Sequence, residues 1–190
     1  MNPPAEQTFP DPSQCSPDFV LFKYDHIYRH NIMRVNYTTY DVRRSQEVVS
    51  ATTSHCNVVV PNDTAEDEAH PFRYARVLGI YHANVVYVGP GMVDYYPRRL
   101  EFLWVRWYRR LETFNTGWEA HKLDRVQFPS IADDGAFGFL NPSDVLRCCH
   151  MIPAFSKGKV QSDGKGLSYC AKDGKDWVAY YINRQVFSQQ

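Results

Sequence analysis

Short runs of apolar residues, separated by turn-forming residues, predict a chain built mainly of β-strands. The strongest run is residues 100–108, and because side chains alternate along a strand, one face carries Leu103, Val105 and Trp107. The opposite face carries Phe102, Trp104, Arg106 and Tyr108. Both faces are largely apolar, which is typical of a central strand rather than an edge strand.

Further strands are predicted where β-branched and aromatic residues gather: 35–42, 58–60, 72–81, 85–88, 123–128 and 177–186. The run 85–88 either continues the strand at 72–81 past a bulge or forms the next strand. Residues 145–152 fit a short helix or a strand. Just before them, Asn141 is a candidate N-cap followed by Pro142 at the first helical position. A chain of about seven short strands with little helix predicts a mainly β fold, a small bent-sheet β-barrel with short helices.

The ends and one long loop differ from this core in composition. Residues 1–17 hold five of the 12 prolines, so we expect a flexible tail there. Residues 18–34 mix aromatic and basic side chains and predict a short helix or an ordered arm. Residues 156–176 are rich in Gly, Lys, Ser and Asp, which is typical of a mobile loop. We therefore expect a single β domain at 35–187.

Charge and cysteine content narrow the class of protein. The 190 residues include 21 Lys+Arg and 21 Asp+Glu, and this zero net charge disfavours a general nucleic-acid coat protein. No apolar run approaches the ~20 residues that cross a bilayer, and the first residues show no secretory signal. Five cysteines without framework spacing indicate free thiols in a reducing compartment. We expect a nuclear location, with a cytoplasmic one as the alternative, and no membrane partner.

Candidate catalytic groups are weak in this sequence. The acidic run at 63–68 ends near His70 and offers ligand types for a divalent metal, which keeps a metal-dependent nuclease open as an alternative. A charge run between two strands is more often a solvated loop. The seven histidines are scattered and no Gly-x-Ser-x-Gly elbow is present. We expect no cofactor, no structural metal and no catalytic residue.

Two other groups of residues suggest binding. The arginines that bracket predicted strands could form a positive patch for phosphate, or could extend into water from stems packed on aromatic rings. These are Arg43, Arg44, Arg98, Arg99, Arg106, Arg109 and Arg110. The aromatic residues on or beside the central strands could form the core, or could form an open cage for a methylated ammonium. These are Tyr74, Tyr81, Trp104, Trp107, Tyr108 and Trp118.

The middle of the chain resembles a bromo-adjacent homology (BAH) domain. The resemblance lies in 71–80 (PFRYARVLGI), 105–113 (VRWYRRLET) and 140–151 (LNPSDVLRCCHM), and it covers roughly residues 35–153. Leu111 stands where the family's second motif has Pro, and Arg109 stands where family cages often place an aromatic residue. The resemblance implies a BAH-like scaffold that binds chromatin, a histone tail among its candidate ligands.

A wider resemblance, over about residues 35–184, is to the C-terminal region of proteins encoded by basidiomycete DNA transposons of the Plavaka kind. It lies in the stretches 35–44, 70–85, 101–109 and 137–155. No transposase catalytic core is present in the sequence. This resemblance implies a transposon-derived accessory domain with no DNA-cleaving activity of its own.

Together these observations predict a non-catalytic binding module for a histone tail or another protein. The candidate anchors are Tyr74, Trp104, Trp107 and Tyr108, with Asp67, Glu68 or Glu112 as counter-charge. A nucleic-acid-binding accessory domain of a mobile-element protein, using the seven arginines, is the alternative.

Overall fold

The computed structural model describes residues 16–38, 44–62, 70–111 and 123–183. These residues form an antiparallel, mainly β structure, and their helices are 3-10 turns of three residues each. The turns are η2 (Pro17–Phe19), η4 (Pro142–Asp144), η5 (Phe155–Lys157) and η6 (Asp173–Lys175). The described part of the chain contains no helix with the length and hydropathy that a bilayer crossing requires.

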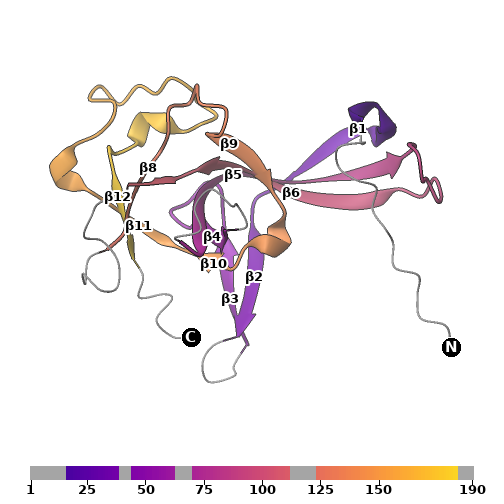
Figure 1. Cartoon of the computed structure of the whole chain (residues 1–190), viewed down its shortest axis with the longest axis horizontal. Helices are drawn as coiled ribbons and strands as arrows, with labels where there is room; N and C mark the ends of the chain where they lie inside the picture. The colour runs from indigo at the N-terminus through magenta and orange to yellow at the C-terminus, as the bar shows by residue number, and fades with distance from the viewer. Residues whose placement is uncertain (1–15, 39–43, 63–69, 112–122, 184–190) are drawn as a thin grey trace. The chain divides into compact units, whose positions relative to one another are not determined.

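Twelve strands are found in the described residues (Figure 1). They are β1 (Val20–His30), β2 (Met33–Thr38), β3 (Arg44–Val49), β4 (Asn57–Pro61), β5 (Phe72–Tyr87), β6 (Arg98–Trp107), β7 (Arg109–Arg110), β8 (Arg125–Gln127), β9 (Phe137–Leu140), β10 (Arg147–Cys148), β11 (His150–Pro153) and β12 (Tyr180–Asn183).

The strands form three sheets. Six strands form the order β10-β4-β5-β6-β9, with β1 pairing β5; four form β11-β12-β8-β7; and β2 pairs β3. The expected barrel is not found as a closed one among the described strands, because the chain changes sheets instead of closing one. It leaves β6 at Trp107 and enters β7 at Arg109, and between them the Tyr108 N–H donates to the Tyr74 carbonyl at 2.9 Å.

Several predicted elements take a definite form. The ambiguous stretch 145–152 follows the turn η4 and contains two short strands, β10 and the start of β11, and no helix. Asn141 caps that turn by accepting a hydrogen bond from the Ser143 N–H at 3.0 Å. The arm at 18–34 is mostly strand, and the run 72–81 and residues 85–87 belong to one long strand, β5. The predicted end of the last strand lies partly outside the described residues.

The chain divides into two compact units. The smaller unit comprises residues 1–28 and 82–101, and the larger comprises 29–81 and 102–190, so β5 and β6 contribute to both. The predicted boundaries at 17, 34 and 187 stay predictions.

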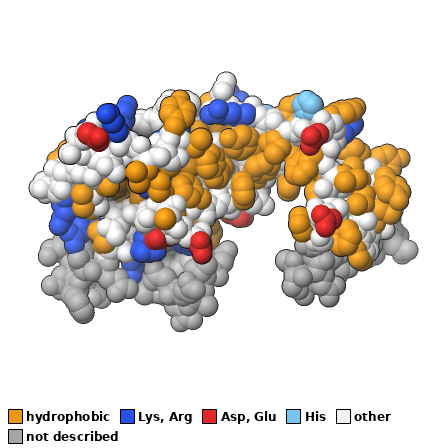
Figure 2. Space-filling model, turned by 90° about the horizontal axis from the view of Figure 1, so that it is seen from above, with side chains coloured by type: hydrophobic (Ala, Val, Ile, Leu, Met, Phe, Trp, Pro, Cys, Tyr) orange, Lys and Arg blue, Asp and Glu red, His pale blue; other side chains and the backbone are white. Residues whose placement is uncertain are grey.

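The smaller unit exposes many apolar side chains, as Figure 2 shows on one of its faces. Among the described residues of this unit, Ala83 and Gly89 are buried. Tyr28 stacks on His82 with ring centroids 4.7 Å apart, and the Val88 N–H donates to the Phe19 carbonyl at 2.8 Å.

The larger unit holds two apolar clusters, one on each face of β4 and β5. Val58 and Val60 point into the first cluster and Val59 into the second, because successive residues of a strand face opposite ways. The predicted alternation of β6 is confirmed in the same way. Leu103 and Val105 are fully buried in the first cluster.

Candidate functional site

A cleft of about 300 Å³ opens where β5 begins and β6 passes into β7. Four of its ten lining residues are aromatic and three are arginines. They are Asn62, Phe72, Arg73, Tyr74, Trp107, Tyr108, Arg109, Arg110, Pro129 and Gly135. The described lining therefore combines ring faces with guanidinium groups.

Strand pairing places the two main walls. Phe72, Arg73 and Tyr74 are the first residues of β5, where they pair with Pro61, Val60 and Val59 of β4. The hydrogen bond from Tyr108 to the Tyr74 carbonyl then holds the junction of β6 and β7 against the start of β5. Residues more than thirty positions apart in the sequence thus line one cleft.

Trp107 is one of the four aromatic residues that line the cleft. Its side chain is half-buried and packs against the first apolar cluster. The guanidinium carbon of Arg73 lies 4.0 Å from the centroid of the Trp107 ring, a cation–π contact. Gly138 of β9 permits a close approach, since a Cβ there would lie 2.6 Å from the indole Nε1. The indole is therefore fixed in position.

Tyr74 and Tyr108 also line the cleft, although little of either side chain is exposed. Both are buried in the second apolar cluster, and Tyr108 stacks on Phe128 with ring centroids 4.0 Å apart. The Tyr108 hydroxyl donates to Asn57 Oδ1 at 3.0 Å. Burial raises the pKa of Tyr108 well above its usual value, against the lowering effect of Arg76, so the phenol stays a proton donor. These two tyrosines position the walls more than they present open faces.

The structure brings three of the four predicted aromatic anchors together: Tyr74, Trp107 and Tyr108. Trp104 does not line the cleft, and stacks on Phe137 with ring centroids 6.1 Å apart. The predicted acidic partners Asp67, Glu68 and Glu112 lie outside the described residues.

The predicted arginines separate into groups with different surroundings. Arg109 and Arg110 line the cleft, and Arg109 Nη2 lies 3.4 Å from the Asp133 carboxylate. Arg98 and Arg99, in the smaller unit, pair with Asp94 at 3.0 Å and with Glu101 at 2.8 Å. Arg43 lies outside the described residues, and Arg44 begins β3.

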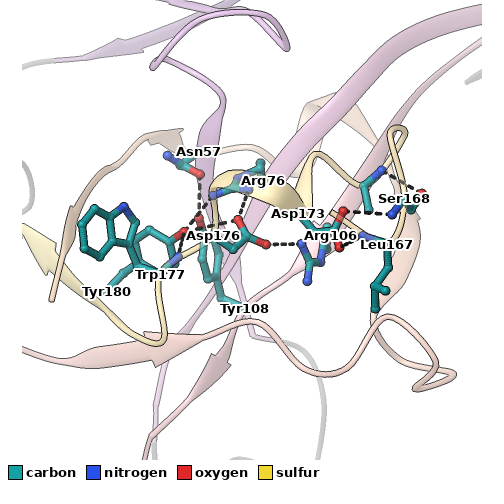
Figure 3. Close-up of polar contacts among 11 residues, drawn as sticks. Asn57, Arg76, Arg106, Tyr108, Leu167, Ser168, Asp173, Asp176, Trp177 and Tyr180 are labelled. Atoms are coloured by element: carbon teal, nitrogen blue, oxygen red, sulfur yellow. Dashed lines mark hydrogen bonds and ion pairs between the residues drawn. The ribbon is translucent and has the colours of Figure 1, made fainter. Parts of the chain in front are cut away.

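Arg106 belongs to a buried network, shown in Figure 3. Its Nη1 donates to Asp176 Oδ2 at 2.5 Å, and Arg76 Nη1 donates to Asp176 Oδ1 at 2.6 Å. The Tyr180 hydroxyl donates to the same carboxylate at 3.3 Å. With only 5% of its side chain exposed, Arg106 joins the strands to the C-terminal loop and is closed to a nucleic-acid phosphate.

A second cleft, of about 380 Å³, lies beside β3 and β10. Glu47 there accepts hydrogen bonds from the Cys148 backbone N–H at 2.7 Å and from Arg147 Nη2 at 3.0 Å. Burial, reinforced by the Glu47 carboxylate, raises the pKa of the Cys148 thiol to about 12. This thiol is therefore a poor nucleophile at neutral pH.

The alternative prediction of a metal-dependent nuclease depends on the segment 63–70, most of which lies outside the described residues. Of the 63–70 segment, His70 is described, and its Nε2 lies 3.3 Å from Asp124 Oδ2. Its Nδ1 lies 2.9 Å from the Phe72 carbonyl oxygen. Within the described ranges, no group of three or more His, Cys, Asp or Glu side chains is arranged to hold a metal ion.

Sequence reasoning missed Arg73, whose guanidinium covers the Trp107 ring, and Asp176, which joins Arg76 and Arg106. The signal for Arg73 is its place between two aromatic residues at the start of a strand, Phe72 and Tyr74. No local signal marks Asp176, because its partners lie 70 and 100 positions away in the sequence.

No protein-family model, curated protein or solved structure matches this chain. The resemblance to BAH domains and to the transposon-encoded proteins thus stays a prediction.

Proposed function

We propose that this chain is a non-catalytic binding module on a BAH-like scaffold, and that the cleft takes a segment of a chromatin protein or of another protein partner. One observation carries the proposal. Two of the three stretches of the resemblance, 71–80 and 105–113, supply seven of the ten residues that line the cleft. A nuclear location is part of the same proposal.

The chemistry of the lining favours holding a ligand over transforming it. Trp107 carries the stacked guanidinium of Arg73, and Arg109 adds a second planar donor group; Trp and Arg are both enriched where proteins bind one another. The Tyr108 phenol keeps its proton because its pKa is raised, and its hydroxyl donates a hydrogen bond to Asn57 Oδ1, so it is poorly suited to act as a base.

A binding assay tests the proposal. Purified protein is titrated against an array of peptides that includes unmodified and lysine-methylated histone tails, acidic sequences and neutral sequences. We expect at least one class to bind, and the Trp107→Ala variant to weaken that binding about tenfold or more, as loss of a central aromatic anchor does. Gly138→Ala should weaken it too, since the added Cβ displaces the indole.

Tyr169→Ala is the matched aromatic control, because Tyr169 is 98% exposed and does not line the cleft. Circular dichroism and thermal unfolding check that each variant folds. If no peptide class binds, or if Trp107→Ala binds as the unaltered protein does, the proposal is wrong.

The alternative function, a nucleic-acid-binding accessory domain of a mobile-element protein, has one observation in its favour. Arg109 and Arg110 are adjacent and both line the cleft. Titration with duplex DNA at low and high salt tests it, because phosphate contacts give an affinity that falls steeply with salt.

A further inference from the structure

The cation–π contact of the cleft has consequences for which ligands fit. A ligand cation binds an aromatic cage by lying over a ring face. Over the Trp107 ring that position is taken by the guanidinium of Arg73, at 4.0 Å from the centroid. Arg73 is half-buried in β5 and its backbone pairs with Val60 of β4, so the contact is built into the sheet. A methylated lysine would have to displace it.

Stacking also prepares Arg73 to bind an anion. The guanidinium is planar, and its N–H donors point outward in that plane, so a ring contact through the face leaves the donor edge directed sideways. A guanidinium held this way offers a carboxylate or phosphate two parallel hydrogen bonds, with less side-chain entropy to lose. Trp107 therefore acts as a platform that orients Arg73.

Arg109 provides a second cation in the same lining. Its contact to Asp133 is long, at 3.4 Å, and the two side chains are 63% and 41% exposed. Ion pairs this exposed are weak, so a ligand anion can replace Asp133. Among the described residues that line the cleft, none is acidic.

We propose that the cleft recognises an acidic side chain of a protein segment, an aspartate, glutamate or phosphorylated residue, held by Arg73 and Arg109. This inference rests on the proposed function and names its ligand class. Arg73 supplies the oriented fork and Arg109 the second positive charge, while Phe72 offers an apolar wall to the neighbouring part of the segment.

A protein segment fits better than duplex DNA. A cleft of about 300 Å³ with four aromatic lining residues accommodates one or two side chains. Duplex binding draws its affinity from many phosphate contacts spread along a basic face. This chain has a net charge of zero, and Arg98 and Arg99 are each paired with a carboxylate.

The experiment measures fluorescence anisotropy with four short labelled peptides of one parent sequence. One carries Asp and Glu, one carries phosphoserine, one has Asn and Gln in the acidic positions, and one carries trimethyl-lysine. We expect the acidic or the phosphorylated peptide to bind at least about tenfold more tightly than the Asn/Gln peptide. This difference corresponds to the loss of one charge-assisted hydrogen bond. The stronger of the first two identifies the source of the anion.

Arginine variants assign the contact. Arg73→Gln and Arg109→Gln should each weaken binding of the preferred acidic peptide about tenfold. Arg73→Lys, which keeps the charge but loses the planar fork, should fall between Arg73→Gln and the unaltered protein. Arg34→Gln is the matched control, because Arg34 is exposed on β2 and lies outside the cleft lining. The affinity of this variant for the preferred acidic peptide should equal that of the unaltered protein.

Arg73→Gln also uncovers the ring, so this variant should bind the trimethyl-lysine peptide more tightly than the unaltered protein does. The inference is overturned if the protein prefers the trimethyl-lysine or the Asn/Gln peptide to both anionic peptides and this binding depends on Trp107. The proposed function would still stand in that case. If none of the peptides binds, both the inference and the proposed function are wrong. Binding of duplex DNA through the same two arginines, without peptide binding, overturns both in favour of the nucleic-acid alternative.

Discussion

Asp176 accepts hydrogen bonds from two arginines of different strands, and replacing it with asparagine should destabilise the fold strongly. Asp176 is 3% exposed, Arg106 5% and Arg76 14%, so water screens these charges little. Breaking a buried ion pair from one side costs about 3–5 kcal/mol because the remaining charge is left uncompensated. The carboxylate of Asp173 also interacts with Arg106, so we expect the lower end, about 3 kcal/mol.

Urea unfolding followed by tryptophan fluorescence measures this free energy. The control is Asp163→Asn in an exposed position, where Asp163 accepts from the Lys165 N–H at 2.9 Å; there the change should stay within about 0.5 kcal/mol. A loss below about 1 kcal/mol for Asp176→Asn would refute the reasoning. It would mean that both guanidinium groups find other acceptors or water.

A second variant separates the charge effect from lost packing. Replacing all three members together, with Arg76→Met, Arg106→Met and Asp176→Leu, removes the buried charges as well as their attraction. Such apolar replacements of a buried ionic group are often neutral or stabilising. The triple variant should therefore be more stable than Asp176→Asn alone, although it carries more substitutions.

Three further predictions concern single side chains. Tyr108→Phe should lower the free energy of unfolding in urea by about 1–2 kcal/mol, because it leaves Asn57 Oδ1 without its 3.0 Å donor. Glu47→Gln should lower the pKa of Cys148 from about 12 and so speed its alkylation by iodoacetamide, followed by peptide mass spectrometry; an unchanged rate contradicts it. Burial raises the pKa of Asp173, but two backbone N–H donors and other contacts outweigh it and the net pKa is lowered. Its contribution to stability is thus present above about pH 4 and lost as pH falls through the folded-state pKa, and Asp173→Asn should flatten the acid limb of the unfolding free energy against pH.

A sequence pattern can predict a strand when the strand's own residues show which side chains are buried on each of its two faces. In β6 the period-two alternation puts Leu103 and Val105 into one cluster, as expected. Val58 to Val60 of β4 face both clusters in turn, which explains their continuous apolar run. These features need no knowledge of the partner strand.

Sheet membership depends on pairings between distant segments, and here sequence reasoning was less successful. β12 pairs β8 through Tyr180 and Val126, which are far apart in the chain. The change of sheet at Tyr108 depends on a backbone hydrogen bond to Tyr74. No local pattern encodes either contact, so a barrel and three separate sheets are equally compatible with the sequence.

The arginines show the same limit at the level of the site. Arg106 and Arg109 both read as strand-end cations in the sequence, yet one is buried against Asp176 and the other lies exposed in the cleft. The difference comes from the carboxylate that each meets. That carboxylate is 70 positions away for Arg106 and 24 positions away for Arg109.

Salt separates these two roles for arginine in one protein. At 0.1 M salt, interactions between exposed charges more than about 10 Å apart are largely screened, and shorter exposed contacts weaken as salt rises, whereas buried pairs are screened much less. The pair formed by Arg106 and Asp176 should therefore keep its contribution to stability as salt rises. Ligand affinity that depends on Arg73 and Arg109, which lie in an open cleft, should fall over the same range. In one salt series, the contribution of the pair formed by Arg106 and Asp176 to the free energy of unfolding should stay constant, while the ligand affinity should fall. The two arginine roles differ because an arginine that is neutralised by a carboxylate within the fold has little charge left to offer a ligand.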